Sequence, residues 1–389
     1  MSIIITKYIL FFLTFLRPFL MSPAFELNEA DLIFSIAFIA FSFLYILFLK
    51  KFDSKNFAPT VLIFFLTVFT FSLLRHPVSL KHLYVYIFYL SVFYFAFYEE
   101  KKRPLLVLIV VTSMAVALYS LRSYFIISRY LLEYLELKEI NYGFGREFVQ
   151  RGRAFAPFFL PSLLGGYLAM AIPICLGFIT EEVKLKKRRL FLFFWIICFV
   201  CFSLVLYLTQ SIGALVALFC AIAFYLILRR KLNLKILILI FILLTVIASV
   251  LYIRQSGEDF TKPFFSLEKR LSYWRNTWQI IKDNPFTGKG LGNLSLAQSR
   301  FVHNSYLQLW GESGLFSLLA FLAVIFLFIK KGTEKIKAEG RFCEKGVVVA
   351  GIVFLIHNLI DFTFFVSQVS FLWWIILAIV LSRDSFGRP

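Results

Sequence analysis

The sequence predicts an all-α, polytopic membrane protein with about twelve transmembrane helices. Of its 389 residues, 60% are hydrophobic and 19% are aromatic, and the mean hydropathy is +0.84. A soluble protein of this length would be far more polar. A helix that crosses a bilayer needs roughly 20 apolar residues, and many stretches of the chain meet that requirement. The strands of a membrane barrel would show short alternation of apolar and polar residues instead, and no such pattern is seen.

Twelve apolar runs are expected to span the membrane and to form a single integral membrane domain over residues 1–389. They cover residues 3–20, 31–49, 58–75, 82–98, 104–121, 157–179, 190–208, 212–229, 235–253, 303–329, 346–365 and 367–382. No convincing small-residue cleavage site follows the first run. We therefore expect that run to be a retained helix and not a signal peptide.

Basic clusters orient these helices. They lie at residues 50–55, 101–103, 184–189, 229–235 and 330–345. All five fall on one side of the membrane if the twelve runs alternate, and the positive-inside rule makes that side cytoplasmic. Both termini are then cytoplasmic as well. The net charge of +19 is therefore partly a topology signal and no sign of nucleic-acid binding, although basic juxtamembrane loops also suit anionic lipid.

A second population of arginines lies on the opposite side, in two long extracytoplasmic loops at residues 122–156 and 254–302. It comprises Arg122, Arg129, Arg146, Arg151, Arg153, Arg254, Arg270, Arg275 and Arg300. Snorkelling in a solvated loop explains any single one of them. The whole set works against the positive-inside rule, and the arginine guanidinium suits bidentate contacts with phosphate. As a group, these arginines favour anion binding.

An amphipathic helix is expected at residues 267–283 in the second loop. Ser266 suits its N-cap, and Pro285 ends it. Its apolar face comprises Leu267, Leu271, Trp274, Trp278 and Ile281. That face is expected to lie on the membrane surface or to cap the bundle. Arg275 lies about 140° around an ideal helix from Arg270, so the two arginines should not share a face.

Polar residues then lead into the tenth expected helix. The glycine-rich run 288–292 follows no strand, so it is not a dinucleotide fingerprint; a tight turn and backbone N–H groups that approach a phosphate both remain open. His303 opens the helix. A neutral imidazole there can accept a hydroxyl proton near neutral pH, and an interfacial structural histidine is the alternative. Glu312 is about half a turn out of phase with His303 and is a better partner for Gln308.

His357 and Asp361 are four positions apart and are expected to share one face of the eleventh helix. Ionisable groups inside a membrane are costly and usually face a polar interior. Asp361 would then orient His303 or Arg270 without touching the substrate itself, or form a structural hydrogen-bonded pair with His357. The five cysteines suggest no disulfide framework. No extracytoplasmic acidic cluster suits a metal, so neither a metal nor another cofactor is expected.

Five motifs follow one another in the second half of the chain. They are Arg270-Leu-Ser-Tyr-Trp274-Arg275, residues 283–293, His303-Asn-Ser-Tyr-Leu307, Glu312-Ser-Gly314-Leu and His357-Asn-Leu-Ile-Asp361. The ordered set resembles the O-antigen ligase and O-antigen polymerase family of bacterial envelope glycosyltransferases. The resemblance covers roughly residues 200–382, and residues 151–168 also look like the family segment that enters the sixth helix.

The resemblance implies a fold of the membrane glycosyltransferase C type. It also implies a metal-independent, inverting transfer from an undecaprenyl-diphosphate-linked glycan, at the periplasmic face of the bacterial inner membrane. His303 would be the base that activates the acceptor hydroxyl, with Asp361 as a further catalytic residue in a supporting role. The residues expected to bind the diphosphate are Arg270, Arg275, Arg151 and Arg153. Those expected to support the site are Glu312 and His357.

One position departs from the family pattern. The family usually carries an arginine after a serine between the seventh and eighth helices, whereas here Ser211 is followed by Ile212. Another arginine, such as Arg153 or Arg275, would then take its place, or part of the diphosphate contact is lost.

The leading interpretation is a ligase, which moves a finished glycan to a lipid A–core sugar hydroxyl. A polymerase that elongates a carrier-linked glycan and a protein O-oligosaccharyltransferase use the same donor chemistry and remain open. The modest second external loop slightly favours the ligase. From another class, a lipid or glycan transporter would need polar residues along a path through several helices, and most of the expected helices are nearly bare of them.

Overall fold

The computed structural model describes residues 3–20, 29–49, 58–73, 80–138, 148–185, 189–229, 234–255, 265–296, 299–338 and 341–382. These segments are helical apart from turns and connections, and the only β-pairing among them is an isolated bridge between Leu296 and Ser299. The predicted all-α class is confirmed.

Each of the twelve expected spans contains a helix. In chain order they are α1 Ile3–Leu16, α2 Glu29–Leu49, α3 Pro59–Leu73, α4 Leu80–Tyr98, α5 Lys102–Arg122, α8 Pro161–Leu185, α9 Arg189–Thr209, α10 Ile212–Leu228, α11 Leu234–Gln255, α13 Ser305–Lys337, α14 Phe342–His357 and α15 Ser367–Leu381. Within the described residues, five helical stretches are long and apolar enough to cross a bilayer. They are Glu29–Leu49, Lys102–Tyr134, Pro161–Leu185, Arg189–Thr209 and Ser305–Lys337. The complete set of twelve spans, and the side of each loop, stays a prediction.

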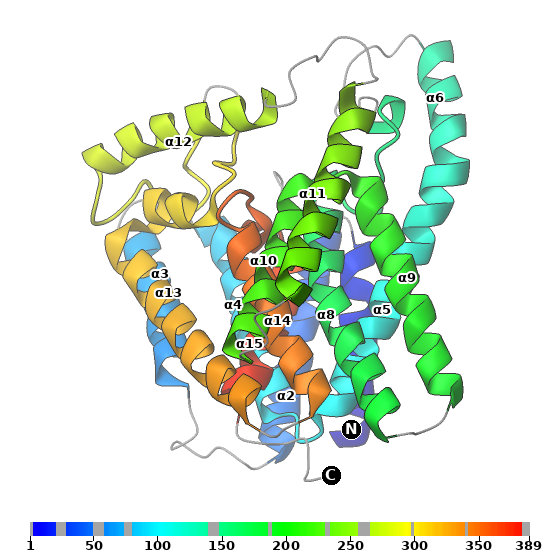
Figure 1. Ribbon diagram of the computed structural model, residues 1–389. Coiled ribbons are helices and arrows are strands. Elements are labelled where there is room, and N and C mark those ends of the chain that lie inside the picture. Colours follow the sequence, from blue (N-terminus) through cyan, green and yellow to red (C-terminus); the bar gives the residue numbers. More distant parts are fainter. Residues whose placement is uncertain are drawn as a thin grey trace. The chain divides into compact units, whose positions relative to one another are not determined.

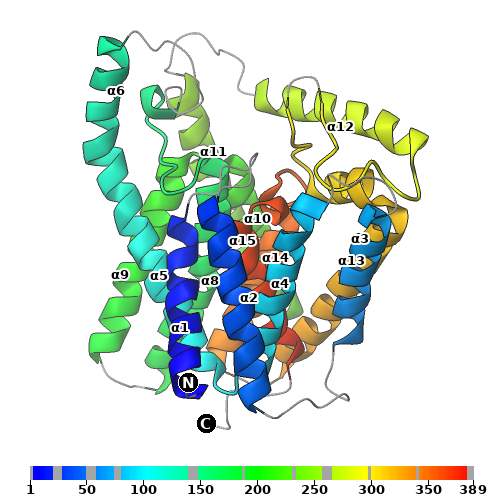
Figure 2. The same cartoon turned by 180° about the vertical axis from the view of Figure 1, so that it is seen from behind.

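Contacts divide the chain into two compact units. The first takes Met1–Leu105, Ser266–Glu334 and Asn358–Pro389, and the second takes Leu106–Phe265 and Lys335–His357. In the first unit, α4 packs against both α2 and α15, and α1 packs on α2 (Figures 1 and 2). In the second, α8 packs against α14 and α9, and α10 packs against α14 and α11.

An aromatic cluster forms the core of the first unit. Trp374 of α15 is fully buried, and its ring packs against Phe64 and Phe65 of α3, Tyr89 of α4 and Phe364. Such rings bury large apolar areas and favour offset or edge-on contacts. Part of the abundance of phenylalanine in the chain, 51 residues, therefore serves packing inside the protein.

Close helix approach at small residues builds the second unit. A Cβ added to Gly346 of α14 would lie 2.3 Å from the carbonyl oxygen of Pro173 in α8. One added to Gly165 of α8 would lie 2.9 Å from Cβ of Ser211, just before α10. Glycine lets backbones pack this tightly, as is common between membrane helices.

The first external loop, expected at residues 122–156, begins with helical structure. Helix α5 continues through a π-helical stretch, Ser123–Ile127, into helix α6, Ser128–Leu137. The physical reason is that apolar and helix-forming residues continue through this segment, so nothing ends the helix. Residues 139–147, which include Arg146, lie outside the described residues.

The eleventh helix is shorter than predicted. Helix α14 ends at His357, and a turn follows before the 3-10 helix Thr363–Phe365. The expectation that His357 and Asp361 share a helix face is therefore wrong. The side chain of Asn358 accepts hydrogen bonds from the hydroxyl of Ser305 and from the N–H of Phe364, which favours the turn over another helical step.

Candidate functional site

Helix α12, Phe265–Asp283, lies across one end of the first unit, over the ends of α3, α4 and α13 (Figures 1 and 2). Its end just before Pro285 agrees with the sequence prediction. It begins one residue before Ser266, so Ser266 falls in the first turn and is not the N-cap. At the opposite end of this unit, helix α1 begins and helix α15 ends (Figure 1).

The buried face of α12 is rotated from the predicted apolar face. Thr277 and Ile281 are 0% and 2% exposed, whereas Leu271 and Trp278 are 41% and 44% exposed. Leu271 and Trp278 therefore do not cap the bundle, and the contact of this face with the membrane surface stays a prediction. The reason lies in the partner surface: Gly311 leaves room for Thr277 and Ile281 beside it. Arg270 lies two turns before Thr277 and shares its side of the helix.

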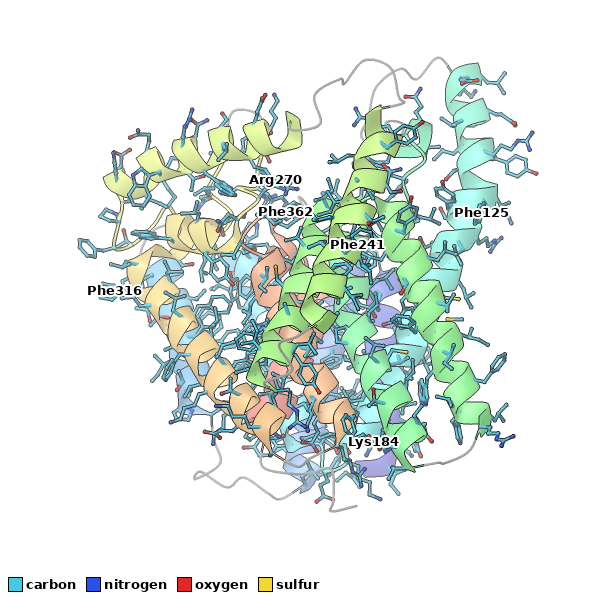
Figure 3. The ribbon with its side chains drawn as sticks, viewed as in Figure 1. Phe125, Lys184, Phe241, Arg270, Phe316 and Phe362 are labelled. Atoms are coloured by element: carbon cyan, nitrogen blue, oxygen red, sulfur yellow. The ribbon has the colours of Figure 1, made fainter. Side chains whose placement is uncertain are left out.

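The sequence-predicted residues Arg270, His303 and Asp361 come together in the first unit. Nη2 of Arg270 lies 3.8 Å from Oδ2 of Asp361, and Nδ1 of His303 lies 3.9 Å from Oδ1 of the same carboxylate. The side chain of Asp361 is 1% exposed, while those of Arg270 and His303 are 19% and 21% exposed. Figure 3 labels Arg270 on α12 and Phe362, the residue after Asp361. Two candidate ligands of a substrate thus share one buried carboxylate.

Aromatic rings hold the imidazole of His303. Tyr273 of α12 stacks on it with ring centroids 6.0 Å apart, and Phe362 meets it edge-on at 4.8 Å. Phe362 in turn stacks on Phe301 at 4.1 Å. The Nδ1 atom of His303 is buried, so Nε2 is the nitrogen that can meet a substrate.

The backbone of His303 is held in the left-handed region, with φ of +54°. Few residues other than glycine adopt this conformation, and it persists only where the surroundings enforce it. Helix α13 begins at Ser305, so His303 precedes the helix and does not open it as predicted. The Ser305 N–H donates to the carbonyls of Asn358 and Asp361, at 2.9 and 3.1 Å, which pins the chain just after His303.

His303 is neutral at physiological pH. Burial lowers the pKa of its imidazole, the carboxylate of Asp361 raises it, and the guanidinium of Arg270 lowers it further, to a value of about 4. A neutral imidazole has a free lone pair, which a general base requires.

A buried hydrogen-bond chain fixes the residue before His303. The N–H of Val302 donates to Oε1 of Gln308 at 3.2 Å, and Nε2 of Gln308 donates to Oε1 of Glu312 at 3.0 Å. The N–H of Gly292 donates to the other oxygen of Glu312 at 3.2 Å. The predicted pairing of Glu312 with Gln308 is confirmed, and Glu312 supports His303 only through this chain.

The glycine-rich run forms a tight turn against α13. The N–H groups of Lys289 and Gly290 donate to the carbonyls of Gly311 and Glu312, both at 2.8 Å. Those of Gly288 and Gly292 also donate to protein acceptors. These donors are engaged within the protein, so the geometry fits the tight turn and not a phosphate cradle.

Sequence reasoning missed His82, at the start of α4. An Nη2 of Arg300 lies 2.8 Å from Nε2 of His82, and because arginine is always a donor, His82 is the acceptor. A Cβ on Gly292 would lie 2.3 Å from the ring of His82, so this glycine permits the contact. The predicted topology places the start of the fourth helix and Arg300 on the same, extracytoplasmic side of the membrane. This was the only signal in the sequence that pointed to the contact.

The remaining predicted arginines differ in their settings. Arg275 is exposed on α12, on a flank away from Arg270, as predicted from the helical phase. In the second unit, Nε of Arg153 donates to the carbonyl of Thr209 at 3.0 Å, and its guanidinium lies over the ring of Phe148. The side chain of Arg151 is exposed.

Residues 197–322 match the O-antigen ligase family. The match covers about a third of the chain, and over that part the chain is similar to a family of glycosyltransferase-like enzymes. A search of curated proteins finds no match to the chain.

The matched range contains part of the candidate site. Arg270, His303 and Glu312 lie inside the matched range, and Asp361 and Arg153 lie outside it. Arg153 nevertheless bonds to the turn that leads into α10, just before the position where the family resemblance expects an arginine and the chain has isoleucine. In the described residues, no three His, Cys, Asp or Glu side chains gather as a metal site would require.

Proposed function

We propose that the protein transfers a glycan from an undecaprenyl diphosphate carrier to a sugar hydroxyl, with inversion, at the periplasmic face of the bacterial inner membrane. One observation carries this proposal: Arg270 and His303 both lie within 4 Å of the buried carboxylate of Asp361. A partly exposed cation and a neutral imidazole, held together beside a match to the O-antigen ligase family, are the two groups that this chemistry needs.

Arg270 would bind the diphosphate. Its side chain is 19% exposed, and it donates no hydrogen bond to any residue that the structure describes. Its five N–H donors are therefore available to phosphate oxygens in a fork geometry that lysine lacks. A guanidinium beside the leaving group also stabilises the charge that develops as the glycosidic bond breaks.

His303 would act as the base. Its Nε2 accepts the proton of the acceptor hydroxyl while the oxygen forms a bond to the anomeric carbon of the donor sugar. The bond from that carbon to the diphosphate breaks, and its electron pair leaves with the phosphate oxygen beside Arg270. Because attack and departure occur on opposite faces of the sugar, the configuration inverts.

The favoured acceptor is a sugar of the lipid A core, which makes the protein a ligase. The test uses purified protein, a carrier-diphosphate-linked glycan, and either lipid A–core or a second carrier-linked glycan. Glycan on lipid A supports the ligase, whereas elongation on the carrier alone would show a polymerase.

Three variants test the residue roles in the same assay. His303→Ala should reduce transfer by at least about 100-fold, the lower range for loss of a general base. Arg270→Lys keeps the charge but loses the fork, so the apparent KM for the donor should rise. Lys282→Gln, which removes an exposed cation from the same helix, is the matched control. Wild-type transfer rates in His303→Ala would exclude His303 as the base.

A further inference from the structure

Asp361 lies between two partners and hydrogen-bonds to neither side chain. Its oxygens are 3.8 Å from Nη2 of Arg270 and 3.9 Å from Nδ1 of His303, both beyond hydrogen-bond length. The N–H of Phe362 donates to Oδ1 of the same carboxylate at 2.8 Å. The buried carboxylate thus lies at nearly equal range from the two groups.

We propose that binding of the diphosphate donor draws Arg270 away from Asp361, and that Asp361 then pairs with Nδ1 of His303. The base is thereby strengthened only when the donor is in place. This inference rests on the proposed function and adds a regulation of the same site. The physical driver is competition, because a diphosphate offers a guanidinium short, charge-assisted bonds that Asp361 does not make at 3.8 Å.

The neighbouring contacts decide which member moves. The ring of His303 is held between Tyr273 and Phe362. The backbone of Asp361 is pinned by Ser305, whose N–H and hydroxyl both donate to its carbonyl. The side chain of Arg270 makes no hydrogen bond to any described residue and is partly exposed. The guanidinium is therefore the mobile partner, and a small rotation of the Asp361 carboxylate completes the exchange.

The charges around His303 act in the same direction. The ionisable groups set against it are Arg270 and Tyr273 from α12 and Asp361 from the turn after α14. Without donor, the cation of Arg270 lowers the pKa of His303. A bound diphosphate offsets that cation and adds negative charge, so the pKa of His303 rises. When the acceptor hydroxyl gives its proton to Nε2, the carboxylate of Asp361 stabilises the imidazolium that forms.

The experiment measures the pKa of His303 by NMR of isotope-labelled histidine in the purified full-length protein in micelles. His303→Gln identifies the resonance. Farnesyl diphosphate, a short lipid diphosphate, is the probe, and its binding is followed separately by calorimetry. The expected result is a rise in the pKa of His303 by about one unit or more when the probe saturates the site.

Variants test whether Arg270 and Asp361 cause the change in the pKa of His303. Arg270→Gln should show a raised pKa of His303 without probe and little further change with it. Asp361→Asn should keep probe binding but show a smaller rise, and should lower kcat at least tenfold with little change in the donor KM. Glu334→Gln, an exposed carboxylate on α13, is the control and should behave like the wild type. Thermal unfolding of each variant checks that it is folded.

The outcomes separate this inference from the proposed function. If the probe binds and transfer proceeds, but the pKa of His303 stays constant, the exchange is wrong and the proposed transferase stands. If the probe does not bind and Arg270→Lys leaves the donor KM unchanged, the diphosphate contact and the exchange both fail.

Discussion

Gln308 donates a hydrogen bond from Nε2 to Oε1 of Glu312, 3.0 Å away, in the first turns of α13. The carboxylate is 4% exposed and also accepts the N–H of Gly292. Gln308 in turn fixes the backbone of Val302, because its side-chain oxygen accepts the N–H of Val302. The left-handed backbone of His303 therefore depends on a carboxylate nine residues away that does not touch the imidazole.

Glu312→Ala should lower both stability and activity. It leaves the buried Nε2 donor of Gln308 and the part-buried N–H of Gly292 without this acceptor, and the buried donor alone costs about 1–3 kcal/mol. The melting temperature should fall, and kcat should fall because the conformation of His303 loosens. Thermal unfolding and transfer assays check this, with Glu334→Gln as the exposed control. An unchanged melting temperature would show that the two donors find other acceptors.

Gly314→Ala should destabilise the first unit. Gly314 has φ of +81° and ψ of 174°, and an added Cβ would lie 2.0 Å from the carbonyl oxygen of Phe286. A non-glycine residue in this region costs about 1–3 kcal/mol before any clash. The break it makes in α13 lets the Leu315 N–H donate to the carbonyl of Pro285 at 3.0 Å.

The measurement for Gly314→Ala is thermal unfolding in detergent. Leu319→Ala, at a 51% exposed position of the same helix, is the control. A melting temperature for Gly314→Ala equal to that of this control would contradict the role of the break.

Sequence patterning predicted most of the helices because each apolar run has one low-energy form in a membrane. It also predicted the divergence of Arg270 and Arg275, which follows from helical phase alone. It could not predict the rotation of α12, since Gly311, about thirty residues further along the chain, decides which side is covered. The contact of Arg300 with His82 spans 218 residues and has no local pattern.

The arrangement of the site was predicted only in part, since Asp361 was expected to orient His303 or Arg270 and not both. A helical spacing suggested that His357 would accompany Asp361, but a turn follows His357 and takes Asp361 out of the helix. Asp361 lies beside both of its predicted partners, Arg270 and His303. Such sharing depends on tertiary packing, which periodicity does not encode.

Arg153 is predicted to replace the family arginine that is absent at Ile212. Its bond to the carbonyl of Thr209 ties it to the turn before α10. Arg153→Ala should therefore raise the apparent donor KM several-fold, and Ile212→Arg in that background should restore it. Donor titration of the single and double variants checks this. If the double variant folds but Ile212→Arg does not restore its donor KM, Arg153 does not take the place of the family arginine.

The pH dependence of activity should follow the lowered pKa of His303. In the free protein, burial lowers the pKa of this imidazole to about 4, so it stays neutral at higher pH. The acid limb of kcat/KM, which reports the free enzyme, should therefore lie well below the ordinary histidine value of about 6.5. The limb of kcat should lie higher, because the bound donor offsets Arg270. An acid limb of kcat/KM near the ordinary value would contradict the burial of the base.

The folding stability should also depend on pH because of the lowered pKa of His303. Between the folded pKa of about 4 and the unfolded value of about 6.5, the unfolded chain binds the extra proton, so stability falls as the pH falls through this window. In His303→Gln that contribution is absent. The difference in melting temperature between wild type and His303→Gln should therefore shift against the wild type from pH 7 to pH 4.5. A difference that stays constant over this range would mean that His303 titrates alike in both states, and the imidazole would then be solvated and not held beneath Tyr273.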